Sequence, residues 1–126
     1  MFNKHTDVRV ETLICGELRT AKEQHGESFN SLHEAYAVAL EELEEASDNV
    51  NMCQRCFRIL WGQIKEDCEK NEIKEYLHKV RNHYAVEAIK ELAQFAAMID
   101  KTLETLEEFK EATTEKISVT QKGDEQ

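Results

Sequence analysis

Closely spaced carboxylates at residues 41–45 suggest a site for a divalent cation. These residues read EELEE, and at 3.6 residues per turn Glu41, Glu42 and Glu45 lie along one flank of a helix. Like charges three or four residues apart destabilise an isolated helix by roughly 0.2–0.5 kcal/mol per pair, and a bound cation removes that cost. Taken alone, the run is more simply interpreted as a solvated acidic face. Other parts of the sequence are needed to distinguish a cation site from a solvated acidic face.

A second set of carboxylates occurs later in the chain. Helical spacing places Glu87, Glu91 and Gln94 on one flank of another expected helix. If the two helices pack antiparallel, Glu42 and Glu45 face Glu87 and Glu91 across a shared groove. Carboxylate oxygens are hard ligands that suit Mg²⁺. We therefore predict that these four glutamates hold Mg²⁺.

The helix that carries the first set is expected at residues 31–49. Ser31 and Glu34 form an S-x-x-E capping box, in which each side chain accepts a hydrogen bond from the other residue's backbone N–H. Apolar residues three and four apart predict one buried stripe. Its members are Leu32, Ala35, Tyr36, Ala39, Leu43, Ala46 and Val50.

A second apolar stripe runs through residues 85–110 and predicts a long helix. This stripe would pack against the helix at 31–49 or against a second copy of the chain. Its length suggests oligomerisation. Its members are Ala85, Ala88, Ile89, Leu92, Phe95, Ala96, Ile99, Leu103, Leu106 and either Phe109 or Lys110.

Turn-forming residues mark where the helices begin and end. Asp7 is the expected N-cap of a first helix, which ends at Gly26. Polar residues at 48–51 predict a break or a kink in the second helix, and the polar run at 66–72 predicts a loop. The last helical segment is expected to be interrupted near Asn82.

The chain is expected to form one all-α domain of four or so helices at residues 7–112. Its 126 residues contain no proline and only four glycines, which favours long helices. Residues 1–6 are predicted to be disordered. Residues 113–126 lose the apolar pattern and are predicted to form a mobile tail.

Charge and hydropathy exclude several classes of partner. The formal charge of −10 repels a phosphate backbone, so we expect no DNA or RNA partner. No apolar run approaches the ~20 residues of a membrane-spanning helix, so a soluble, cytoplasmic protein is expected. Four cysteines are then reduced thiols. Cys53 and Cys56 form C-x-x-C without the second close pair of a zinc site, and they fit an apolar helix stripe better.

Several cationic and aromatic residues are candidates for binding a phosphate or a nucleobase. Arg19 and Lys22 lie three residues apart on the first helix. Trp61 lies between Arg58 and Lys65, so one helical face carries an aromatic ring between two cations. Solvated cations and a core or interface tryptophan are the structural alternatives to these roles. Glu34 and Gln94 complete the set of predicted nucleotide-binding residues.

Two segments resemble the motifs of the MazG-type nucleoside triphosphate pyrophosphohydrolases, an EExxE helix followed by a helix carrying ExxD. Residues 41–45, EELEE, are similar to the first motif, and residues 90–98, KELAQFAAM, are similar to the second. The chain more closely resembles MazG-like proteins of low-GC Gram-positive bacteria and their phages, through ELRTA, FNSLHEAYAVALEE and ELAQFAAM. Together these pieces cover most of residues 11–100.

The resemblance implies a MazG-like helical bundle, dimeric or tetrameric, with sites built between subunits. It implies that Glu42, Glu45 and Glu91 hold Mg²⁺, which holds the phosphates of a nucleotide, with Glu41 and Glu87 as lesser candidates. Gln94 departs from the family pattern because it stands where the ExxD aspartate is expected. A neutral amide can coordinate a metal through its oxygen but cannot act as a base.

Three functions remain open at the level of sequence. The first is a protein that binds a nucleotide or nucleotide-derived signal with little or no hydrolysis, as a sensor or a phage-type sequestering protein, and Gln94 favours it. The second is a Mg²⁺-dependent nucleoside triphosphate pyrophosphohydrolase, with Glu41 or Glu45 activating the attacking water. The third is a helical interaction protein that binds no ligand.

Overall fold

The structure, a computed structural model, describes the backbone of residues 7–124 and the side chains of residues 7–111. It confirms the all-helical prediction, and no strand occurs in this part of the chain. The elements, in chain order, are α1 (Val8–His25), α2 (Leu32–Lys65), α3 (Lys70–Lys79), a π-helical segment η1 (Val80–Ala85) and α4 (Val86–Asp124). No described helix is both long enough and apolar enough to cross a lipid bilayer.

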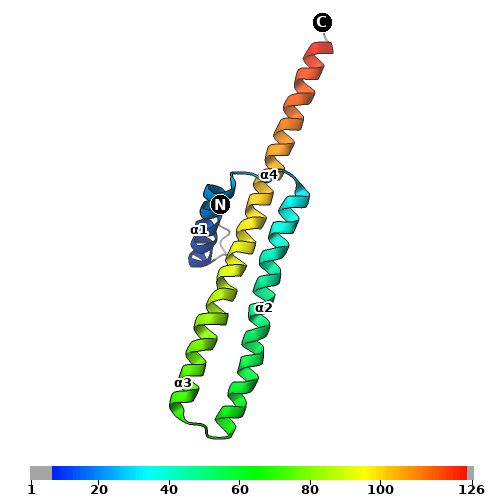
Figure 1. Cartoon of the computed structure of the whole chain (residues 1–126). Coiled ribbons are helices and arrows are strands. Elements are labelled where there is room, and N and C mark those ends of the chain that lie inside the picture. Colours follow the sequence, from blue (N-terminus) through cyan, green and yellow to red (C-terminus); the bar gives the residue numbers. More distant parts are fainter. Residues whose placement is uncertain (1–6, 125–126) are drawn as a thin grey trace.

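The α2 helix and the continuous α3, η1 and α4 segment form a long antiparallel hairpin (Figure 1). The α1 helix packs beside α4, near the end of the hairpin at which α2 begins. The half of the hairpin that contains α3 has no third helix over it, and the far end of α4 extends past the other helices. A connection between α2 and α3 is confirmed where the loop was predicted, but it is shorter than 66–72. It covers residues 66–69, because α2 ends at Lys65 and α3 begins at Lys70.

Both predicted ends of α1 are confirmed. The Asp7 carboxylate accepts a hydrogen bond from the Arg9 backbone N–H at 2.8 Å, as an N-cap does. Gly26 has a φ of 94°, a conformation that side chains disfavour, and its N–H donates to the Lys22 carbonyl at 2.9 Å.

The start of α2 is also confirmed, with one difference in the cap. Ser31 Oγ accepts from the Glu34 N–H at 3.1 Å. Glu34 Oε2 accepts instead from the Asn30 side-chain amide at 3.1 Å. The structure therefore contains one of the two hydrogen bonds of the predicted capping box. In place of the second, in which Glu34 would accept from the Ser31 backbone N–H, Glu34 accepts from Asn30.

Three predicted boundaries are corrected. Of the break or kink predicted at 48–51, the break is wrong, because α2 continues through these residues and Asn49 donates its side-chain amide to the Glu45 carbonyl within the helix. The interruption expected near Asn82 is a π-helical segment, which adds a residue to a turn without ending the helix. The α4 backbone stays helical beyond residue 112 to Asp124. The disorder predicted for residues 1–6 lies outside the described residues, and the mobility predicted for residues 113–126 stays a prediction.

The core lies where α1, α2 and α4 meet. Its most buried members are Phe29, Ala35, Ala39, Ala97 and Met98, and apolar residues of α1 pack against them. Phe29 belongs to the linker between α1 and α2. Its N–H donates to Thr105 Oγ1 at 3.1 Å, and the Lys101 ammonium lies 4.3 Å from the centroid of its ring.

The predicted apolar stripes are only partly buried. On α2 the alanines of the stripe are buried, whereas Leu32, Tyr36, Leu43 and Val50 are exposed. Among the described side chains of α4, the buried residues are Ala88, Ala93, Ala97, Met98, Lys101 and Thr105. The larger members of the predicted stripe are exposed, except Phe95, which is half-buried against the core. Small side chains allow two helix backbones to approach closely, so the alanines form the internal contact and the larger apolar residues lie on the outer surface.

Candidate acidic metal site

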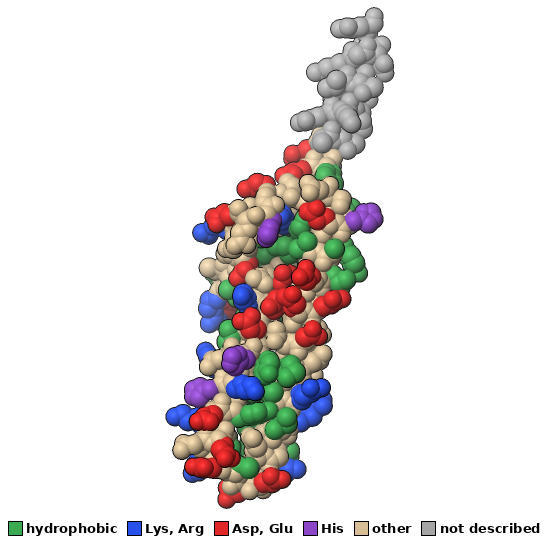
Figure 2. All heavy atoms as spheres, viewed as in Figure 1, with side chains coloured by type: hydrophobic (Ala, Val, Ile, Leu, Met, Phe, Trp, Pro, Cys, Tyr) green, Lys and Arg blue, Asp and Glu red, His purple; other side chains and the backbone are tan. Residues whose placement is uncertain are grey.

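The antiparallel packing of α2 and α4 brings three of the predicted ligands together. Glu42 and Glu45 on α2 and Glu91 on α4 each offer a carboxylate oxygen, and these oxygens lie within 4.8 Å of one another. Acidic side chains gather midway along the hairpin in the space-filling view (Figure 2). We call Glu42, Glu45 and Glu91 the acidic cluster.

The acidic cluster lacks a counter-charge. Glu42 Oε2 and Glu91 Oε2 are buried and accept no hydrogen bond. Among residues 7–111, no lysine, arginine or histidine forms an ion pair with any member of the cluster. Buried carboxylate oxygens normally have a hydrogen-bond donor or a cation beside them, so the arrangement fits a cation ligand.

The surroundings favour protonation of all three carboxyl groups. Burial raises the pKa of Glu42 and of Glu91. The interaction with Glu91 raises the pKa of Glu45. Further repulsion comes from Glu17 of α1, and from Glu41 and Glu87 beside the cluster.

This electrostatic arrangement predicts how stability depends on pH in the absence of metal. A carboxyl group whose pKa is raised by folding stabilises the folded state below its unfolded pKa, about 4.3, and that contribution is lost as pH rises through the folded pKa. The free energy of unfolding, measured by urea denaturation with a chelator present, should therefore fall more steeply above about pH 4.3 in the wild type than in Glu91→Gln. Equal slopes for the two proteins would contradict the repulsion inferred for the cluster.

The remaining predicted acidic residues lie outside the cluster. Glu87 contributes repulsion to Glu91 but is not part of the group of converging oxygens. Glu41 is exposed on α2. Of the two predicted catalytic residues, only Glu45 therefore belongs to the cluster.

A cavity of about 150 Å³ adjoins the cluster between α1, α2 and α4. Glu42 and Gln94 line it, which places Gln94 beside the cluster. Sequence reasoning missed the α1 residues that complete its wall, because nothing in the spacing along α1 shows which side chains face α2. These are Glu17, Thr20, Ala21, Gln24 and His25.

The predicted phosphate-binding cations of α1 do not reach the cluster. Lys22 pairs with Glu104 and with Glu27. Arg19 is exposed and lines no part of the cavity. Glu34, also predicted to contact a nucleotide, serves in the cap of α2.

The predicted base-binding face around Trp61 lies far from the acidic cluster in one chain. Trp61 follows Glu42 by 19 residues on the same helix, which is roughly 28 Å at 1.5 Å per residue. Trp61 is 57% exposed, and the Lys65 ammonium lies 5.7 Å from the centroid of its ring. Arg58 is exposed on the same part of α2.

The cysteines take no part in the site. All four are free thiols, and no cysteine belongs to a group of converging metal ligands in the described part of the chain. Cys56 is buried against α3, where its interaction with Tyr76 raises the pKa of that phenol to about 12.

Comparison with protein-family models, with curated proteins and with solved structures found no match to this chain.

Proposed function

We propose that the acidic cluster binds a divalent cation, Mg²⁺, and through it the phosphates of a nucleotide or nucleotide-derived signal, with little or no hydrolysis. The observation that carries this proposal is the convergence of three carboxylates from two helices, with two buried oxygens that lack a partner. Holding such groups together without a cation is unfavourable. A cation would compensate both the repulsion and the lost hydration.

The dimensions of the cluster fit a divalent ion. Oxygens on opposite sides of one Mg²⁺ lie about 4.2 Å apart, and around Ca²⁺ about 4.6–5.2 Å apart. The cluster oxygens lie within 4.8 Å of one another, so small side-chain rotations suffice for either ion. Three carboxylates leave positions on the ion for water or for phosphate oxygens, as is usual for Mg²⁺.

The volume of the adjoining cavity limits how much of a nucleotide one chain can hold. Its volume of about 150 Å³ is small beside the roughly 300–1,000 Å³ of ligand pockets. A phosphate group and its ion fit this space, whereas the base and the sugar would lie outside it or against a second copy. The similarity of residues 41–45 and 90–98 to the MazG-type motifs is what suggests a nucleotide as the source of the phosphate.

Gln94 favours binding over hydrolysis. It lies beside Glu42 in the cavity, where the resemblance predicts an aspartate. Its amide can orient a ligand through a hydrogen bond but cannot accept a proton from an attacking water. Glu45 is the remaining candidate to activate water. The alternative function, a pyrophosphohydrolase, depends on this residue.

A thermal-shift screen of nucleotides and cyclic dinucleotides, with and without Mg²⁺, tests the proposal. A bound ligand at 100 times its Kd stabilises the protein by about 2.7 kcal/mol, which is several degrees in Tm. We expect a Mg²⁺-dependent shift that Glu42→Gln abolishes and the exposed matched control Glu44→Gln retains. Ligand recovered intact would support binding, and released pyrophosphate would establish the hydrolase. A metal-independent shift, or none, would contradict the proposal.

We also propose that the chain forms a homo-oligomer, with a dimer as the simplest form. A groove of about 500 Å³ lies between α2 and α4, and none of the side chains that line it is charged. Its walls include Leu32, Tyr36 and Leu43 of α2 and Phe95 and Ile99 of α4, most of them exposed. Contiguous apolar surface of this kind typically marks an association site. A sedimentation experiment from about 1 to 100 µM covers the affinity range expected of such contacts.

A further inference from the structure

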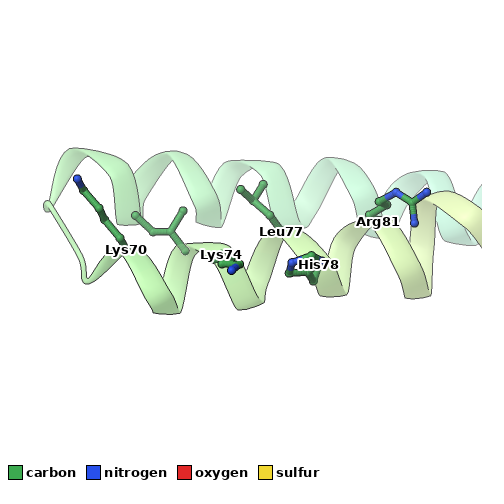
Figure 3. Close-up of a pocket in the computed structure, with 6 residues that line it drawn as sticks. Lys70, Lys74, Leu77, His78 and Arg81 are labelled. Carbon is green, nitrogen blue, oxygen red and sulfur yellow. The ribbon is translucent and has the colours of Figure 1, made fainter.

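A second groove, with a different chemistry, lies at the opposite end of the hairpin. Its volume is about 420 Å³, and only α3 and η1 residues line it (Figure 3). Ile73 and Leu77 form its apolar part. Lys70, Lys74 and Arg81, together with His78, provide its polar part. We call this the α3 groove.

Most charges of α3 are sorted onto two sides, with Lys79 as the exception. At 100° per residue, the cations of the α3 groove share one side of the helix with Ile73 and Leu77. The acidic residues of the helix, 72 and 75, fall on the opposite side. Lys70 and Lys74 are exposed and form no ion pair among residues 7–111. Cations four residues apart repel each other, so an acidic partner would relieve that repulsion.

The same separation of charge holds for the whole molecule. Residues 51–85, which form the α3 half of the hairpin, carry seven Lys and Arg against five Asp and Glu, a formal charge of +2. Residues 7–50 and 86–111 carry six Lys and Arg against eighteen Asp and Glu, a formal charge of −12. Each chain carries a formal charge of −10, so two copies repel each other overall. The antiparallel orientation reduces this repulsion, because it places the α3 half of each copy beside the acidic half of the other.

The far part of α4 has the complementary surface. Leu103 is 56% exposed and Leu106 is 41% exposed. Glu107 and Glu111 are exposed on the same side of the helix, which is opposite to the fully buried Thr105. Neither glutamate forms an ion pair within the described residues. This side of α4 thus offers two leucines beside two free carboxylates, although Lys110 also lies on it.

We propose that the α3 groove of one copy receives the 103–111 part of α4 from a second copy, and that the exchange is reciprocal in an antiparallel dimer. This inference rests on the self-association proposed above and specifies its orientation. Leu103 and Leu106 would cover Ile73 and Leu77, with the carboxylates beside the lysines.

The positions of Leu77 and Leu106 along the chain are compatible with a symmetric dimer. A two-fold axis that places Leu77 opposite Leu106 of the other copy crosses the α3–α4 segment midway between them, beside residues 91 and 92. Leu92 is 45% exposed and Ile89 is 57% exposed, so apolar residues lie near that axis. The contact would have an apolar centre and charged ends, which is the usual composition of an interface.

A charge-swap experiment on the full chain tests the orientation. The double variants Lys70→Glu/Lys74→Glu and Glu107→Lys/Glu111→Lys should each raise the dimer Kd at least tenfold in sedimentation equilibrium. Combining all four changes should restore the Kd to within about threefold of the wild type. The matched controls are Lys79→Glu, on the opposite side of α3, and Glu23→Lys on α1, and each should leave the Kd within about twofold.

The salt dependence of the dimer supplies a second test. Salt screens the proposed charge pairs and also the overall repulsion between two chains of formal charge −10, so the wild type is compared with the variant that lacks the pairs. The difference in Kd between the wild type and Lys70→Glu/Lys74→Glu, at least tenfold at about 0.05 M salt, should shrink to about twofold at about 0.5 M salt. A dimer that resists charge reversal, a difference in Kd that salt leaves unchanged, or a fourfold variant that fails to restore the Kd would overturn this orientation and leave self-association standing. A wild type that stays monomeric at about 100 µM would contradict both.

Discussion

Replacing Phe29 with alanine is expected to lower the free energy of unfolding by about 3–4 kcal/mol. Phe29 is only 4% exposed, and it joins the linker between α1 and α2 to α4. The substitution removes buried aromatic surface and the contact with the Lys101 ammonium, and it opens a cavity in a small core. Urea denaturation followed by circular dichroism, at one fixed protein concentration, measures the change.

Phe57→Ala is the matched control for this substitution. Phe57 is 59% exposed on α2, so truncating it should change the free energy of unfolding by less than about 1 kcal/mol. Since small domains are stable by only about 5–15 kcal/mol, the two variants should be readily distinguished. Equal losses for Phe29→Ala and Phe57→Ala would show that the linker does not anchor the core as the structure indicates.

Replacing Ile99 with aspartate is expected to abolish self-association, raising the dimer Kd at least 100-fold. Ile99 is 42% exposed in one chain and lines the apolar groove between α2 and α4. A buried interfacial carboxylate without a partner costs several kcal/mol, which corresponds to a factor of this size. Sedimentation velocity across a concentration series measures the dimer Kd.

The control for Ile99→Asp is Val10→Asp. Val10 is 51% exposed on α1 and lies outside the groove. Both variants should keep the helical circular dichroism of the wild type, because neither residue belongs to the internal core. If Ile99→Asp associates as tightly as Val10→Asp, the groove between α2 and α4 is not the interface.

The helices themselves were predictable because their ends are encoded locally. Asp7, Gly26 and Ser31 cap helix ends through bonds within a few residues, and the structure confirms all three. Of the break or kink predicted at 48–51, the break does not occur, because the polar residues there also bond locally, within the helix. Polar residues in mid-helix can satisfy their side chains on the preceding turn, as Asn49 does.

The faces of the helices were harder to predict, because periodicity does not distinguish an internal core from an outer apolar surface. Ile89, Leu92 and Leu103 obey the core spacing and yet are exposed. The internal contact of α4 is made instead by alanines, by Met98 and Thr105, and by Lys101, a residue type that is rarely buried. Phe29 was missed because it lies in a linker, where no helical pattern indicates burial.

The acidic cluster was largely predictable, since one assumption about packing was enough. Helical spacing defined the flanks of α2 and α4, and antiparallel packing then brought Glu42, Glu45 and Glu91 together. Glu87 did not join them, because the depth and rotation of two helices depend on the size of the side chains between them. For the same reason, the sequence did not predict which α1 residues line the cavity beside Glu42.

The central claim, that the acidic cluster holds a divalent cation, is tested most directly by calorimetric titration of chelator-treated protein with Mg²⁺ and, separately, with Mn²⁺. The wild type and Glu44→Gln should bind one ion per chain with the same affinity, and Glu91→Gln should bind at least tenfold more weakly. Glu44 is an exposed glutamate of α2 outside the cluster, so it controls for the loss of one charge. Absence of binding at millimolar metal, or equal binding by Glu91→Gln and the wild type, would contradict the claim.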